Sequence, residues 1–286
     1  MVKKFWSSAI TNPHPLSHLF MGLVDVFSMS YNGVSAHPLM LAHAVDEARS
    51  IVKRLYKILK LLYPNLVDTE VCDNPRRFDS VINGITHASA ESSFQPSPLQ
   101  FVTDSFVSRI YPTLFTLYVM HNSSSDSRYW RNVSILYGKN ACQLLTFLEV
   151  KRRLWPKNLQ VSIDDHTLED CDVNKKSEMT FLTEAVDCLQ RLSSEFSPFQ
   201  KLKIIAETFQ HVKCHIEAGC EGSAWGLDTL YPVFMLIVVR SRIQHLGAEL
   251  HLIQDFVPYI KLLGEIDMMF TTLKACYYQI VEERRF

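Results

Sequence analysis

The sequence predicts an all-α protein, and three observations lead to that fold class. Only 9 of the 286 residues are glycine, about 3%, against a usual share near 7%. Phosphate-binding loops and tight β-hairpin turns need backbone conformations that favour glycine, so the sequence has little material for either. Several segments repeat apolar residues at helical spacing, and no stretch alternates apolar and polar residues for the length of a strand. We therefore predict a multi-helix bundle.

The composition is that of a folded protein without a general attraction for nucleic acid or anionic lipid. Hydrophobic residues make up 47% of the chain, enough apolar surface to offset the entropy of ordering it. The 29 Lys and Arg residues balance 30 Asp and Glu residues, for a formal net charge of −1. Seven scattered cysteines without a CxxC pair indicate free thiols in a reducing compartment. With no signal-peptide pattern and no apolar run long enough to cross a bilayer, we expect a cytoplasmic protein.

The first predicted helices lie in the N-terminal part of the chain. A helix over roughly Pro15 to Met29 should pack against a second helix that ends at Tyr63-Pro64. The second helix has one continuous apolar face, because its apolar residues follow one another in steps of three and four. The members of this stripe are Leu41, Val45, Ala48, Val52, Leu55, Leu59 and Leu62.

The middle of the chain alternates loops and helices. Residues 64 to about 97 lose the periodicity and collect Asp, Asn, Pro and Ser, which predicts a long flexible connection. Helix resumes from Leu99 to Met120, and we expect it to break at the polar cluster 121–127. It is predicted to return from Tyr129 to Trp155, before a second loop at 156–176.

Further helices follow in the C-terminal part. The first has the apolar stripe Leu182, Val186, Leu189 and Leu192, and the second begins with a capping box in which Pro198 is the first helical residue after Ser197. The last two are predicted over Ala248 to Phe256 and Glu265 to about Glu283.

Between them, a strongly apolar helix is predicted to begin at Asp228. This helix is apolar almost all round through Val239, so it must be buried in the bundle. Asp228 is expected to cap its first free N–H groups. An acid on such a rigid platform is also suited to meet a cation of a partner at a fixed position.

Two other patterns could indicate a metal site or a nucleotide-binding loop. His211 and His215 stand one helical turn apart with Cys214 between them, a spacing that can hold zinc. These residues also fit the polar face of their helix, and no HExxH pattern supplies a general base, so we expect no metal. Gly138-Lys139 lacks the flanking glycine and Ser/Thr of a phosphate loop, so we expect no nucleotide cofactor.

Four segments of the C-terminal half resemble a known family. The domain that they resemble is the Vps-nine (vacuolar protein sorting nine) domain, and the resemblance is closer still to the C-terminal region of alsin-type proteins. The segments are Asp228-xxx-Pro232-Val233, Leu246–Phe256, Gly264-Glu265 and Phe270–Leu273. Because the likeness extends to upstream segments such as Arg109–Tyr118, it implies an N-terminal helical region at 1–141 packed on a Vps-nine-type helical core at 142–286.

The resemblance implies a guanine nucleotide exchange factor that activates Rab-five-subfamily small GTPases in early endosome trafficking. In the family, the aspartate at the position of Asp228 engages the phosphate-loop lysine of the GTPase and competes with magnesium and the β-phosphate. Pro232 would then support the geometry of Asp228, Thr271 would give a polar contact, and Val233 and Met268 would give apolar contacts to the switch regions. Met268 stands where the family commonly has a tyrosine, three residues before the threonine.

Such a protein performs no covalent chemistry, because an exchange factor acts by binding the nucleotide-free GTPase more tightly. We expect no cofactor, a GTPase partner, recruitment to early endosomes, and self-association or association with alsin-type proteins. Two alternatives remain open. One is a binding scaffold that has the groove but lacks exchange activity, which Met268 suggests; the other is a helical metalloenzyme built on His211, Cys214 and His215.

Overall fold

A computed structural model describes residues 15–33, 36–63, 97–156, 182–220, 226–257 and 264–284. Within these ranges the regular structure consists of α-helices and short 3-10 helices, without a strand, so the all-α prediction is confirmed. Almost all of the connection predicted at 64–97, and the loop predicted at 156–176 from residue 157 onward, lie outside the described residues.

The chain divides into two compact units, each built from three separate segments of the sequence. Unit 1 comprises Met1–Ser123, Glu195–Leu202 and Gly247–Met268, and unit 2 comprises Ser124–Ser194, Lys203–Leu246 and Met269–Phe286. The domain boundary between residues 141 and 142 stays a prediction.

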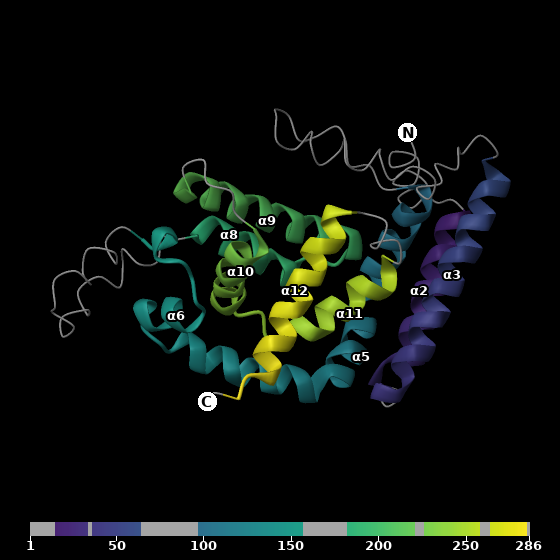
Figure 1. The fold of residues 1–286 in the computed structure, drawn as a ribbon. Helices are drawn as coiled ribbons and strands as arrows, with labels where there is room; N and C mark the ends of the chain where they lie inside the picture. Colours follow the sequence, from purple (N-terminus) through teal and green to yellow (C-terminus); the bar gives the residue numbers. More distant parts are fainter. Residues whose placement is uncertain are drawn as a thin grey trace, which may run out of the picture. The chain divides into compact units, whose positions relative to one another are not determined.

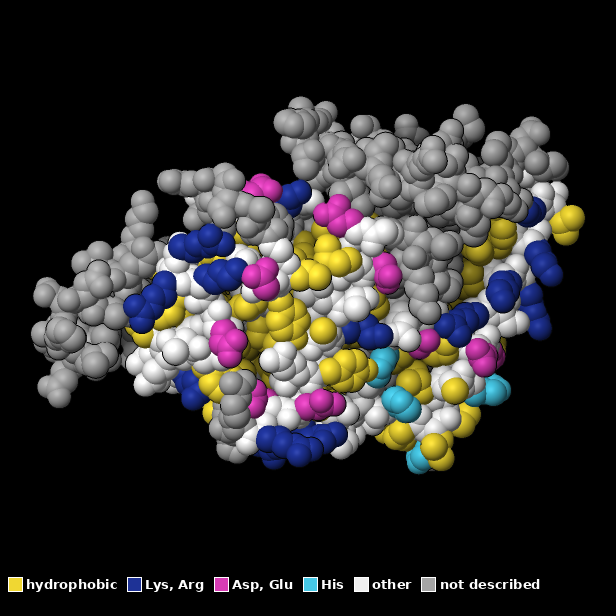
Figure 2. Space-filling view, viewed as in Figure 1, with side chains coloured by type: hydrophobic (Ala, Val, Ile, Leu, Met, Phe, Trp, Pro, Cys, Tyr) yellow, Lys and Arg dark blue, Asp and Glu magenta, His cyan; other side chains and the backbone are white. Residues whose placement is uncertain are grey.

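Helices α2 (Pro15–Tyr31) and α3 (Leu41–Leu62) pack side by side in unit 1 (Figure 1). The predicted apolar stripe of α3 is buried along its length except at its last member, Leu62, which is 50% exposed. The helix ends where predicted, at Leu62, and Tyr63 is its C-cap, whose N–H still donates to the carbonyl of Leu59 at 2.9 Å. The opposite face is basic, with Lys53, Arg54 and Lys57 exposed, and Figure 2 shows Lys and Arg side chains along this edge.

Two later helices complete the core of unit 1. These are the first part of α5 (Pro98–Tyr137) and most of α11 (Leu246–Phe256), which confirms the helix predicted over Ala248–Phe256. The side chains that they bury against α2 and α3 include Phe106, Ile110, Leu114, Tyr118, Ala248, Leu252 and Phe256.

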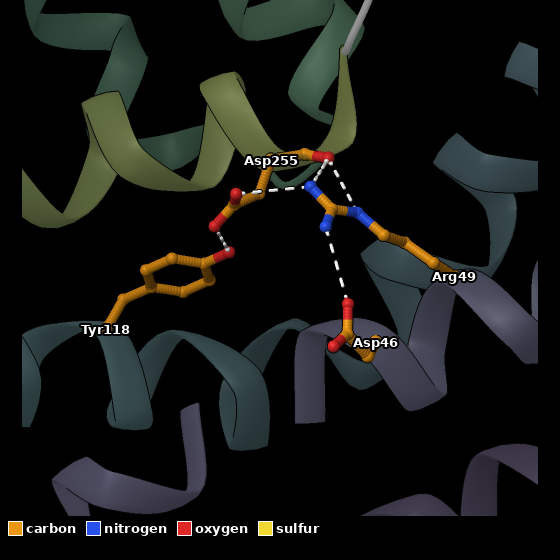
Figure 3. Close-up of polar contacts among 4 residues, drawn as sticks. All are labelled: Asp46, Arg49, Tyr118 and Asp255. Carbon is orange, nitrogen blue, oxygen red and sulfur yellow. Dashed lines mark hydrogen bonds and ion pairs between the residues drawn. The ribbon is translucent and has the colours of Figure 1, made fainter. Parts of the chain in front are cut away.

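A network of polar contacts holds α3 to the end of α11 (Figure 3). The guanidinium of Arg49 donates to the carbonyl oxygen of Asp255 from Nε at 3.1 Å and from Nη2 at 2.6 Å. The same Nη2 atom lies 3.1 Å from Oδ1 of Asp255, and the hydroxyl of Tyr118 donates to Oδ2 at 2.7 Å. Arg49 also forms an ion pair of 3.6 Å with Asp46 on its own helix.

Helix α5 corrects the prediction for the middle of the chain. It continues through the polar cluster 121–127, where a break was expected. The cluster remains helical because its key side chains find partners without leaving the helix. Asn122 donates to the carbonyl of Tyr118 at 2.8 Å, and the buried Asp126 accepts a hydrogen bond from Tyr277 at 2.8 Å.

The helix predicted from Tyr129 to Trp155 is also wrong, because α5 ends at Tyr137. Helix α6 (Ala141–Phe147) follows, with the side chain of Asn140 accepting from the N–H of Gln143 at 2.8 Å as its N-cap. A short 3-10 helix, η3 (Arg152–Leu154), completes this segment.

Unit 2 contains a buried helix with others packed on it. Helix α10 (Leu227–Ser241) packs against α8 (Thr183–Gln190), and the ring of Phe234 lies 4.0 Å from that of Phe209 on α9 (Pro198–Cys220). Helix α12 (Glu265–Glu282) ends within one residue of its predicted end.

The N-terminus of α9 confirms Ser197 as the predicted N-cap but only one half of the predicted capping box, because the N–H of Ser197 donates to Oε1 of Glu195 at 3.0 Å and not to the side chain of Gln200. Pro198 is its first residue, and the Oγ atom of Ser197 accepts from the N–H of Gln200 at 3.2 Å.

Candidate functional site

The candidate site lies at the N-terminal end of α10 in unit 2. Ten of the fifteen residues of this helix are buried, so the prediction that it lies inside the bundle is confirmed. The burial of Phe234, Leu236, Ile237 and their neighbours fixes the axis of α10, which therefore presents its first turn from a rigid element.

Asp228 is the second residue of α10, and the prediction that it is the N-cap is wrong. The helix begins at Leu227 with Gly226 as its N-cap, whose carbonyl accepts from the N–H of Leu230 at 3.0 Å. The Asp228 side chain is 72% exposed, as a group that meets a partner must be. It still lies in the first helical turn, where the free N–H groups favour a negative charge.

The carboxylate of Asp228 is bound by Lys151, a residue that no sequence pattern distinguished. Nζ of Lys151 lies 2.6 Å from Oδ2 of Asp228 and 2.7 Å from Oγ1 of Thr229, so one ammonium group joins both side chains. Thr229 is 2% exposed, which places one end of this bridge inside the protein and the other at its surface.

The main chain around Lys151 is itself well anchored. Nε1 of the buried Trp155 donates to the carbonyl of Val150 at 2.8 Å, and Leu154 is 2% exposed. Lys151 directly precedes the first residue of η3, so its Cα position is set by these buried neighbours.

The surroundings of Asp228 favour the ionised form of its carboxyl group. Its pKa is lowered, first by the hydrogen bond from Lys151 and further by the main-chain N–H groups of Thr229 and of Asp228 itself. Gly226 leaves room for this arrangement, because a Cβ atom there would lie only 3.0 Å from Oδ1 of Asp228.

Pro232 lies inside α10, four residues after Asp228. In an α-helix the carbonyl of residue 228 would accept from the N–H of residue 232, and proline has none. The spacing of the motif therefore leaves the main-chain carbonyl of Asp228 without its regular helical donor.

Pro232 also borders a cavity of about 260 Å³ inside unit 2. Met235 lies beside it, and Tyr231 donates a hydrogen bond to Oε1 of Gln279 on α12 at 2.6 Å. The remaining lining residues come from α5, from α6 and the two residues after it, and from the C-terminal end of α12 and the residue after it. This cavity and hydrogen bond place α10 and the C-terminal part of α12 next to each other.

The other predicted site residues lie in different environments. Met268 and Thr271 are both exposed and one turn apart on α12, so they share a face of that helix. Val233 is 0% exposed, so we assign it to the support of α10 and not to a contact with a partner. Thr271 lies about two helical turns before Gln279, the α12 residue that contacts α10. Among the described residues, the side chain that contacts Asp228 is that of Lys151.

The histidine pattern on α9 does not gather metal ligands among the described residues. Nδ1 of His211 lies 3.5 Å from a carboxylate oxygen of Glu184, and Cys214 is exposed. His215 contacts the main chain of Leu154, and its pKa is lowered by burial. No group of three or more His, Cys, Asp or Glu side chains comes together in the described ranges, so the metalloenzyme hypothesis gains no support there.

The class of protein follows from a match to a family model. Residues 182–284 match the vacuolar sorting protein 9 (VPS9) domain, and they include α8 to α12 with Asp228 and Thr271. This stretch of the chain is therefore a VPS9 domain, and the predicted resemblance is confirmed.

The similarity to individual proteins extends over almost the whole chain. The chain is 37% identical to alsin of Rattus norvegicus over 297 residues, which covers 99% of this chain and 17% of that protein. It is 28% identical to the ALS2 C-terminal-like protein of Mus musculus, over 99% of this chain and 28% of the relative. An alsin homolog of Drosophila melanogaster is 26% identical over 93% of this chain. The chain thus spans about a sixth of the alsin length and about a quarter of the second relative.

Proposed function

We propose that this protein is a guanine nucleotide exchange factor for small GTPases of the Rab-five subfamily. The observation that carries the proposal is the position of Asp228, an exposed carboxylate in the first turn of the buried helix of a VPS9 domain. The proposal joins this geometry to the role that family resemblance assigns to the motif aspartate.

The proposed mechanism is electrostatic. Bound GDP is held by a lysine and a magnesium ion that neutralise its phosphates. A carboxylate that reaches this lysine and competes with the magnesium ion and the β-phosphate removes much of that stabilisation. Exchange needs no covalent step, because the factor accelerates release by binding the nucleotide-free state more tightly.

Asp228 has the properties that this role requires. Its carboxylate is charged at neutral pH, as an exposed aspartate is, and the burial of α10 limits how far its main chain can move. Pro232 supports the same turn, while Met268 and Thr271 offer an exposed apolar and an exposed polar contact on α12. Because Val233 is buried, the proposal gives it no partner contact.

The direct test is the release of labelled GDP from a panel of early-endosomal Rab proteins. We expect the wild-type protein to accelerate release from at least one Rab-five-type GTPase, and Asp228→Ala to abolish the acceleration. Asp187→Ala is a suitable control, since it removes an exposed acid from α8 in the same unit. Circular dichroism and thermal unfolding should show that both variants remain folded.

Equal acceleration by the wild-type protein and Asp228→Ala would contradict the mechanism while leaving the class of activity standing. Absence of acceleration for every GTPase tested would contradict the proposed function itself.

A second candidate is a scaffold that binds the GTPase without accelerating exchange. The observation that favours it is Met268, which places a thioether on the exposed face of α12 where the family commonly has a tyrosine hydroxyl. This candidate predicts GTPase binding with unchanged GDP release, and a gain of exchange activity in Met268→Tyr. Met268→Leu, which adds no hydroxyl, is the matched control.

We further propose that the protein acts at early endosomes, and that it associates with itself or with alsin-type proteins. Among the described residues, no helix combines the length and apolarity needed to cross a bilayer. Location can be tested with a fluorescent fusion and an early-endosome marker, and association with light scattering of the purified protein.

A further inference from the structure

We propose that Lys151 regulates the candidate site by competing with the GTPase for Asp228. This inference rests on the proposed function and adds a residue to it. Lys151 would hold the carboxylate while no partner is bound, and the GTPase would have to displace it before exchange begins.

The first support is the chemical identity of the contact. Nζ of Lys151 lies 2.6 Å from Oδ2 of Asp228, the pairing of ammonium and carboxylate that the mechanism assigns to the phosphate-loop lysine of the partner. Both amines present the same charge and the same N–H donors to the same acceptor. A partner lysine that approaches Oδ2 therefore meets a position that is already occupied.

The second support is the anchoring of Lys151 apart from Asp228. Its ammonium also donates to Oγ1 of the buried Thr229 at 2.7 Å, and its main chain is fixed by the buried Leu154 and Trp155. Little further ordering is then needed for the ammonium to meet the carboxylate, so the contact can re-form each time a partner leaves.

The third support is exposure, which makes the contact reversible. The two side chains are 40% and 72% exposed, so water can replace either partner at little cost. Ion pairs at this exposure shift an equilibrium by no more than about fivefold. Lys151 can therefore lower the rate of exchange without preventing the GTPase from reaching Asp228.

The opposite role would be positioning, in which Lys151 holds Asp228 in the orientation that the GTPase needs. The two roles predict changes of opposite sign when Lys151 is neutralised, because removal of a competitor accelerates exchange and removal of a support slows it. We favour competition because Nζ of Lys151 occupies Oδ2 of the carboxylate at 2.6 Å, an acceptor position that an ammonium group of a partner would need.

The test compares kcat/KM for GDP release among the wild-type protein, Lys151→Gln and Lys151→Arg. Glutamine removes the charge with a similar reach, and we expect it to raise kcat/KM by about two- to fivefold. Arginine keeps the charge, and we expect it to stay near the wild-type value. Arg153→Gln is the matched control, since it removes one positive charge from an exposed side chain two residues away and should not accelerate release.

A second measurement follows the contact itself. The pKa of the Asp228 carboxyl, measured by NMR, should rise in Lys151→Gln and stay unchanged in Arg153→Gln, because Lys151 is the first cause of its lowering. Faster exchange in Lys151→Gln together with this rise in pKa would support the proposal that Lys151 competes with the GTPase for Asp228. Exchange activity that appears only in Lys151→Gln would support it as well.

Exchange that is unchanged or slower in Lys151→Gln, beside an active wild-type protein and an inactive Asp228→Ala, would overturn the competitor alone. If the wild-type protein and Lys151→Gln both fail to release GDP from every GTPase tested, the proposed function fails, and the inference fails with it.

Discussion

Nζ of Lys201 lies 2.7 Å from Oε2 of Glu249, and the two side chains are only 0% and 2% exposed. The hydroxyl of Tyr111 joins them, since it donates to Oε1 of Glu249 at 3.2 Å and accepts from Nζ at 3.3 Å. Burial lowers the pKa of Lys201, and the charge of Glu249 opposes this shift. Each ion is tolerated inside unit 1 because the other accompanies it.

We predict that Lys201→Met destabilises the protein by about 3–5 kcal/mol, because Glu249 would be left as an unpaired buried ion. Urea unfolding followed by circular dichroism measures this loss. Lys213→Met, on a partly exposed position of the same helix, should change the free energy of unfolding by less than about 1 kcal/mol. Lys201→Met combined with Glu249→Leu should recover part of the loss, and a double variant no more stable than the single one would refute this account.

Arg49→Lys should cost about 1–2 kcal/mol although it keeps the charge. The guanidinium of Arg49 reaches the main-chain carbonyl and the carboxylate of Asp255 at once, and a lysine ammonium cannot reproduce that fork. The measurement is again denaturant unfolding. Arg54→Lys, at an exposed position of α3, is the control and should be nearly neutral. Equal stability of Arg49→Lys and the wild-type protein would show that the fork adds nothing.

Asp104 should make stability depend on pH. Burial raises its pKa to about 7, although hydrogen bonds from Gln100 and from the main-chain N–H of Phe199 oppose the shift. Between the unfolded pKa near 4 and the folded value, the folded state retains a proton that the unfolded state has lost. The contribution of Asp104 is therefore complete at low pH, falls as the pH rises toward 7, and stays constant above it.

The variant Asp104→Asn cannot ionise, so it should lack this part of the dependence. From pH 5 to pH 8 the wild-type protein should lose about 2 kcal/mol more stability than the variant does. Urea unfolding at four pH values in that range measures the difference. Parallel curves for the two proteins would mean that the pKa of Asp104 is close to its unfolded value.

The described cysteines should differ in reactivity. Cys214 is exposed, whereas Cys188 and Cys276 are buried, and burial raises the pKa of the Cys276 thiol. Since the thiolate is the reactive form, iodoacetamide should modify Cys214 first, and Cys276 only after denaturation. Site-resolved mass spectrometry over a time course tests this order, with a sample in guanidinium as control. Early modification of Cys276 in the native protein would refute it.

Local patterns allowed much of the fold to be predicted. The stripe from Leu41 to Leu59 is buried as expected, because steps of three and four put its members on one helical face. Ser197 caps α9 because its hydroxyl reaches an N–H three residues ahead. Such features depend on residues three or four positions apart, so they can be predicted from the sequence.

Contacts between distant residues were the ones that could not be predicted. The polar cluster 121–127 resembled a loop, but the burial of Asp126 depends on Tyr277, which lies 151 residues later. Asp228 could be selected because it lies at the start of an apolar stretch of sequence and matches a family motif. Lys151 could not, since its ion pair with Asp228 joins residues 77 positions apart and a surface lysine has no distinguishing pattern.

The composition of unit 1 has a consequence for the synthesis of the chain on the ribosome. Its core is built largely from residues before position 124, but Ala248, Leu252 and Phe256 belong to the same core. At usual elongation rates the ribosome needs on the order of ten seconds to add the intervening residues. During that time the nascent N-terminal helices lack the α11 side chains that complete their core. They are therefore a natural client for a chaperone that binds exposed apolar surface.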